Sequence, residues 1–75
     1  MMKNSLLLNK GIYTWDAVEK SISAFSSLAD ISIAEESNYY HLIFSKCKAD
    51  VEILLNEFRN YVLIVTIKNT GDLYD

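Results

Sequence analysis

The stretch from Glu57 to Lys68, EFRNYVLIVTIK, constrains the fold most, because its composition and its position predict different structures. Five of the seven residues from 61 to 67 are β-branched, as in a strand. The preceding residues have a helical pattern, however, and neither glycine nor proline lies between the two segments. A continuous helix needs no turn here. We therefore predict a helix over about 50–68, ended by Asn69-Thr70-Gly71, with a strand at 61–67 as the alternative.

Apolar residues lie on two sides of this predicted helix. The core stripe consists of Val51, Leu54, Leu55, Phe58, Val62 and Val65. A second strip, on the side away from that stripe, consists of Ile53, Asn60, Ile64 and Ile67. A helix that is apolar on two sides is usually covered on two sides, so this outer strip predicts contact with a partner or a second copy.

The first part of the chain predicts a strand followed by a helix. The apolar run at 5–8 is typical of a short strand. Thr14 then provides an N-cap oxygen, and Asp16 places a negative charge in the first turn, where the helix dipole favours it. We predict a helix over about 15–28, with a core stripe of Trp15, Val18, Ile22, Phe25 and Ala29.

A β-hairpin is predicted between the two helices. Residues 30–35 alternate with period two, 36–38 form a turn, and 39–45 form a second strand. One face of this second strand carries Tyr40, Leu42 and Phe44, and the other carries Tyr39, His41 and Ile43. If helices cover only one face of the sheet, the residues Tyr39, His41 and Ile43 form an exposed patch of the kind that binds partners.

The expected architecture is therefore a single α+β domain spanning residues 1–75, with a core at about 5–68 and a tail at 69–75. The order β-α-β-β-α predicts a three-stranded sheet with two helices on one face. With a strand at 61–67 instead, the chain would form a complete βαββαβ ferredoxin-like sandwich.

No residue pattern indicates catalysis, a cofactor or a metal. His41 is the only histidine, and it lies among apolar strand residues with no evident nucleophile. Cys47 lies between two lysines, which can make a thiol reactive, but no second cysteine and no base accompany it. Glu35 and Glu36 are adjacent carboxylates at the expected hairpin tip, where solvent surrounds them. We expect a protein that is not an enzyme.

Charge and composition exclude several classes of partner. The net charge is −3, and the few basic residues form no stripe that could follow a phosphate backbone, so nucleic-acid binding is not expected. The longest apolar run, 61–67, is too short to cross a bilayer, and no membrane contact is expected. The single cysteine fits a cytoplasmic setting.

The segments IYTWDAVEKSISAF and EFRNYVLIVTIK, in this order of elements, resemble the small HxsD family of His-Xaa-Ser peptide-modification systems. Members end in a helix of the form Glu-Phe-x-Asn-x-Leu-Leu-x-x-x-Leu-Arg. Glu57, Phe58 and Asn60 match that pattern, and Lys68 stands where an arginine is expected. This chain departs from it at Ile64, Val65 and Thr66, where members are more polar, and it has no longer C-terminal extension.

The resemblance implies an accessory protein that works beside radical-SAM maturases and a substrate peptide. Our leading hypothesis is an adaptor that binds a peptide or a maturation enzyme through the sheet patch and the outer strip of the last helix. One alternative is a structural homodimer formed through the same apolar surface, with no other ligand. Another is a small ferredoxin-like enzyme or metal-binding domain, which requires the strand at 61–67.

Overall fold

The computed structural model describes residues 4–70 and contains three strands and two helices. In chain order the elements are β1 (Ser5–Asn9), α1 (Trp15–Ala24), β2 (Asp30–Glu35), β3 (Tyr39–Ser45) and α2 (Val51–Thr70). This is the predicted β-α-β-β-α order, and the α+β fold class is confirmed.

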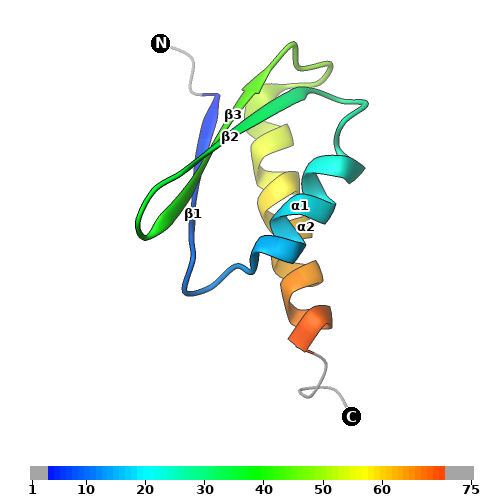
Figure 1. Ribbon diagram of the computed structural model, residues 1–75. Helices are drawn as coiled ribbons and strands as arrows, with labels where there is room; N and C mark the ends of the chain where they lie inside the picture. Colours follow the sequence, from blue (N-terminus) through cyan, green and yellow to red (C-terminus); the bar gives the residue numbers. More distant parts are fainter. Residues whose placement is uncertain (1–3, 71–75) are drawn as a thin grey trace.

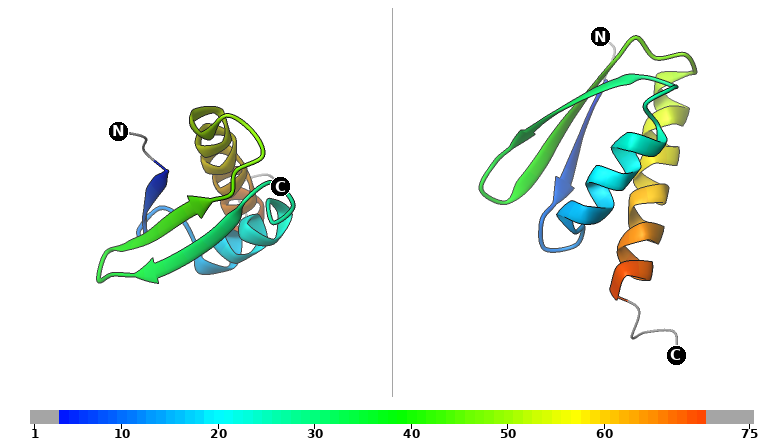
Figure 2. Two further views of the ribbon diagram at one scale, coloured as in Figure 1. Left: turned by 90° about the horizontal axis from the view of Figure 1, so that it is seen from above. Right: turned by 45° about the vertical axis from the view of Figure 1, so that its right-hand side comes forward.

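The sheet forms one layer and the helices form the other (Figure 1). Its strand order is β1-β3-β2, with β3 in the centre and antiparallel to both neighbours. Both helices cover the same face, with α2 on the side of β1 and α1 on the side of β2 (Figures 1 and 2). Within residues 4–70 no element covers the other face of the sheet, and β1 and β2 are both edge strands.

Residues 61–67 belong to α2, so the alternative of a strand there, and with it the complete βαββαβ sandwich, is wrong. The helix begins with a cap, because the Oδ1 atom of Asp50 accepts hydrogen bonds from the backbone N–H groups of Glu52 (3.0 Å) and Ile53 (3.3 Å). Nothing between this cap and Thr70 interrupts the backbone hydrogen bonding. The predicted stop at Gly71 lies outside the described residues.

Helix α1 is shorter than predicted and ends at Ala24 rather than about 28. Its start is as expected, since the Thr14 hydroxyl accepts from the N–H of Ala17 at 3.2 Å. At the other end, the N–H of Ser26 bonds to the carbonyl of Ser23, and the Ser26 hydroxyl bonds to the same carbonyl. Serine competes in this way with regular helical hydrogen bonding, and the chain continues as turns towards Ala29.

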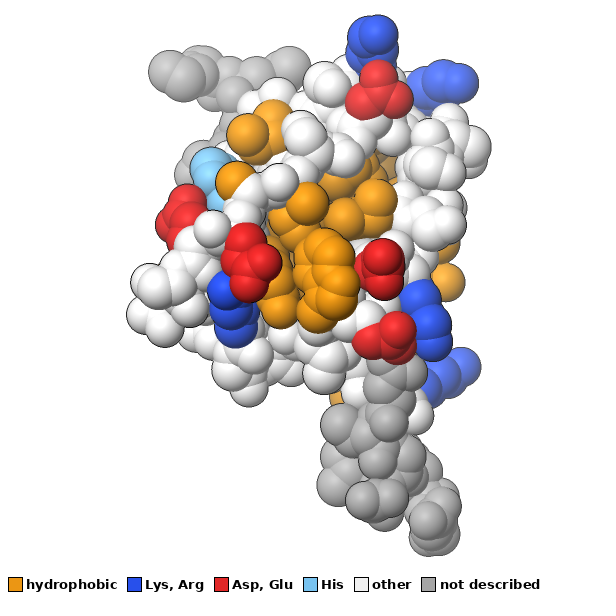
Figure 3. Space-filling model, in the orientation of Figure 1, with side chains coloured by type: hydrophobic (Ala, Val, Ile, Leu, Met, Phe, Trp, Pro, Cys, Tyr) orange, Lys and Arg blue, Asp and Glu red, His pale blue; other side chains and the backbone are white. Residues whose placement is uncertain are grey.

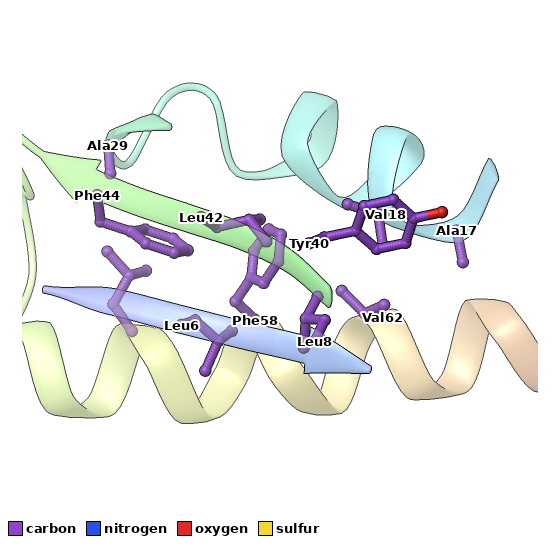
Figure 4. Packing of buried hydrophobic residues seen from close by; sticks show 11 residues of the cluster. Leu6, Leu8, Ala17, Val18, Ala29, Tyr40, Leu42, Phe44, Phe58 and Val62 are labelled. Atoms are coloured by element: carbon purple, nitrogen blue, oxygen red, sulfur yellow. The ribbon is translucent and has the colours of Figure 1, made fainter. Parts of the chain in front are cut away.

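One hydrophobic core lies between the two layers (Figure 4). The buried hydrophobic residues are Leu6, Leu8, Ala17, Val18, Ala29, Tyr40, Leu42, Phe44, Leu54, Phe58 and Val62. Phe58 is fully buried, and its ring makes edge contacts with Phe25 of the α1 C-cap and Phe44 of β3, at centroid distances of 5.1 Å and 5.2 Å. This one side chain therefore joins both helices to the sheet.

Two buried residues are polar, Ser21 and Thr66, and the Ser21 hydroxyl donates a hydrogen bond to the Ala17 carbonyl at 2.7 Å. Thr66 is only 7% exposed, and its hydroxyl has no hydrogen-bond partner among the described residues. The sequence pattern did not assign it to the core stripe. A buried hydroxyl without a partner reduces the stability of the folded state.

We expect Phe58→Ala to lower the free energy of unfolding by about 3–5 kcal/mol, because a large cavity would remain at the centre of the core. A domain of this length has a total stability of only about 4–11 kcal/mol, so this loss is a large fraction of the free energy of unfolding. Phe58→Leu retains most of the buried volume and should lose less. Urea titration followed by circular dichroism compares the two, and equal losses would contradict the central role of Phe58.

Thr66→Val should raise the free energy of unfolding by about 1 kcal/mol, because valine has the same shape and no hydroxyl to desolvate. Thr14→Val is the matched control, since that hydroxyl caps α1 and its removal should cost about 1 kcal/mol. Both values come from the same urea titration. A loss of stability in Thr66→Val would show that its hydroxyl has a partner in solution.

Candidate functional site

The uncovered face of the sheet carries an apolar patch. Leu7, Tyr39 and Ile43 are 55%, 39% and 41% exposed. Tyr39, His41 and Ile43 were predicted for this face, and the structure places all three there. The sequence interpretation missed Leu7, although its position between the buried Leu6 and Leu8 is a signal that could have identified it. We call Leu7, Tyr39, His41 and Ile43 the sheet patch.

Strand register determines the neighbours of each residue in this patch. His41 lies opposite Leu7 on one side and Ala34 on the other. Neither neighbour can exchange a proton with it. Its Nδ1 atom lies 3.7 Å from Oε2 of Glu36, so an ion pair forms when the imidazole is protonated. His41 is thus a polar centre within an apolar surface.

The outer strip of α2 is exposed as predicted over most of its length. Ile53 and Ile64 are 60% and 53% exposed, Asn60 is exposed, and Ile67 is half-buried. This strip faces away from the sheet, because the opposite side of α2 carries the buried Phe58 and Val62. The sheet patch and the outer strip therefore lie on opposite layers, and the structure does not bring them together.

The residues that carry the family resemblance have different positions on α2. Phe58 is in the core, whereas Glu57, Asn60 and Lys68 are exposed. Glu57 and Asn60 follow Ile53 by four and seven residues, so all three lie on one side of the helix. Phe58 is explained by packing, and Glu57 and Asn60 are available to a partner.

A third apolar surface, between β2 and α1, was not predicted. Trp15 was assigned to the core stripe, but it is 44% exposed, and its ring lies 5.4 Å from that of Tyr40. Figure 3 shows hydrophobic side chains gathered in this region, with acidic side chains on both sides of them. Ile31 and Ile33 of β2 pack against the core but remain partly exposed.

Cys47 lies in a pocket of about 330 Å³ beside the start of β1 and the connection from β3 to α2. The lining residues are Asn4, Phe44, Ser45, Lys46, Cys47 and Val51. None of them is a histidine or a carboxylate, so the lining lacks the partner that usually activates a catalytic thiol. Lys46 adopts a φ of 52°, which turns the chain from the strand into this connection.

In residues 4–70 no cluster of three or more His, Cys, Asp or Glu side chains could hold a metal ion. No helix within that range has both the length and the apolar character needed to cross a bilayer. Comparisons with family models, curated proteins and solved structures found no match to this chain.

The sheet patch should be dispensable for folding. We expect Ile43→Thr to change the free energy of unfolding by no more than about 0.5 kcal/mol, because the side chain is already in contact with solvent. Leu42→Thr, the same type of change one residue earlier, should cost at least about 2 kcal/mol because Leu42 is fully buried. Thermal unfolding compares the two variants. Similar losses would mean that something covers the outer face.

Proposed function

We propose that this protein is a non-enzymatic adaptor that binds a peptide or a maturation enzyme. The observation that carries the proposal is the sheet patch, where Leu7, Tyr39 and Ile43 are exposed together on a face that no described element covers. Exposed apolar surfaces of this kind mark sites of protein interaction. A domain this small needs most of its hydrophobic residues for its core, so hydrophobic residues grouped on its surface suggest a role in binding.

The outer strip of α2 provides a second surface for such a role. Its isoleucines surround the polar residues Glu57 and Asn60, which gives a mixed apolar and polar strip suited to a partner helix or groove. Because this strip and the sheet patch lie on opposite layers, two partners could bind at the same time. An adaptor that holds an enzyme and its substrate needs two separate binding surfaces of this kind.

The surroundings of the two potentially reactive side chains, His41 and Cys47, support a binding role rather than a catalytic one. His41 lies opposite the apolar Leu7 and Ala34, and the carboxylate near it, Glu36, is exposed. The pocket around Cys47 has no histidine or carboxylate in its lining. The resemblance to the HxsD family suggests the identity of the partners, which would be a radical-SAM maturase or its substrate peptide. The products of genes that flank this one are therefore the first candidates.

Co-purification and titration with those gene products test the proposal. Ile43→Asp places a charge in the sheet patch, and Ile64→Asp places one in the outer strip. We expect each to weaken binding of one partner by about tenfold or more, because desolvating the new carboxylate opposes the contact. Ser27→Asp, an exposed position in the turn after α1, is the matched control. Unchanged binding in both isoleucine variants would remove the proposed surfaces.

A further inference from the structure

The core is complete beside β1 but incomplete beside β2. On the inner face of β1, Leu6 and Leu8 are 5% and 1% exposed. Ile31 and Ile33 occupy the corresponding inward positions of β2, and both remain partly exposed. The two edge strands therefore differ, since the inward-facing side chains of β2 pack against the core but are only partly covered by the described residues.

The backbone of β2 also has free hydrogen-bonding groups. The N–H of Glu36 donates to the carbonyl of Tyr39, which shows that the even-numbered residues of β2 bond to β3. The N–H and C=O groups of Ile31 and Ile33 therefore point away from the sheet. They have no hydrogen-bond partner among the described residues. An edge of this kind accepts another strand.

The side of α1 that faces this edge forms the second wall of a groove. Trp15 lies against Tyr40, and Glu19 and Ile22 follow Trp15 by four and seven residues, so they lie on the same side of the helix. Trp15 is exposed and Ile22 is half-buried, and Figure 3 shows an apolar surface in the region between α1 and β2. We call this the β2–α1 groove.

The rim of this groove carries both signs of charge, since Lys10 lies 5.2 Å from the centroid of the Tyr40 ring, but its one acidic residue without an ion pair among the described residues is Glu19. The side chain of Glu19 is exposed. Glu35, at the end of β2, is partly neutralised by Lys10 at 2.7 Å. Figure 3 shows acidic side chains on both sides of the hydrophobic surface. Electrostatic complementarity therefore favours a basic ligand.

We propose that the β2–α1 groove binds an extended peptide as an additional strand beside β2. Alternate apolar side chains of the peptide cover Ile31, Ile33 and Trp15, its backbone pairs with the free groups of Ile31 and Ile33, and a basic residue lies next to Glu19. Backbone pairing supplies affinity and the alternate side chains supply specificity in this mode of recognition. The bound segment is about as long as β2, which has six residues.

A second copy of the chain fits this groove less well than a basic peptide. Two β2 strands paired about a two-fold axis would bring together two rims that each carry Glu19, and like charges oppose such contact. The edge of β1 is also a poorer site, because Leu6 and Leu8 are already buried and an added strand would cover little further apolar surface.

This inference rests on the proposed function in one respect, that the protein binds a peptide. It assigns the peptide to a surface distinct from the sheet patch and the outer strip. The groove can therefore be tested without any natural partner.

The probe is an acetylated and amidated peptide in which valine and threonine alternate and a lysine stands at each end. Titration of the full chain, followed by NMR, reports both binding and amide hydrogen exchange. We expect exchange at Ile31 and Ile33 to slow on binding, while exchange at Ser5 and Leu7 on the other edge strand does not change. Slowed exchange only at Ser5 and Leu7, or chemical-shift changes confined to the sheet patch, would overturn the groove.

Variants then test each wall. Trp15→Ala should weaken binding about tenfold or more, because a partly exposed tryptophan is a typical binding anchor. Ile12→Ala, an exposed loop residue, is its control and should bind normally. Glu19→Lys should weaken binding of the lysine probe and strengthen binding of a probe that carries glutamates instead. Identical preferences in wild type and Glu19→Lys would contradict the charge assignment.

The role of the backbone needs a separate test. Ile33→Pro removes one free N–H, whereas Ile33→Val retains it, so only the proline variant should lose binding. Because proline could disturb β2, probes N-methylated at alternate residues are also used with the wild-type chain. Methylation on one edge of the peptide should abolish binding, and methylation on the other should not. Equal effects of methylation on the two edges, or no binding of any probe to the wild-type chain, would overturn the inference. If only the adaptor test failed, because no product of a flanking gene bound, the inference would still stand.

Discussion

The position of Phe58 determines how the two layers meet. Its ring is fully buried between Phe25 and Phe44, and it is the point where α1, α2 and β3 come into contact. A domain of this size has one small core, so the orientation of both helices on the sheet depends on a few such contacts. The edge-to-face geometry of the three rings makes this contact directional as well as apolar.

This packing leaves the protein uneven at its edges. Ala17 and Ser21 of α1 are fully buried, and such small side chains allow a helix to approach its neighbour closely. The side of α1 that carries Trp15 is consequently left partly open beside β2. The same compact arrangement therefore stabilises the helix pair and leaves a groove at one edge of the sheet.

Much of the fold could be predicted from local patterns. Strand alternation placed Tyr39, His41 and Ile43 on the outer face, and the Thr14 cap marked the start of α1. The predicted end of α1 was wrong. Serine side chains after Ala24 compete for backbone hydrogen bonds, and the spacing of apolar residues carries no information about this competition. The candidate site was only partly predicted, since Leu7 was missed and Trp15 was assigned to the core.

The sequence by itself determined which element each segment forms and which face of each element is apolar. The lack of a turn near Arg59 made α2 a continuous helix despite its β-branched residues. Only the tertiary structure decided which apolar faces are covered. Trp15 and Phe58 both lie on apolar helix stripes, yet one is exposed and the other is buried. The reason is that the burial of a side chain depends on the element that packs against it. Helix α1 is short and packs mainly against α2, so it leaves β2 partly uncovered.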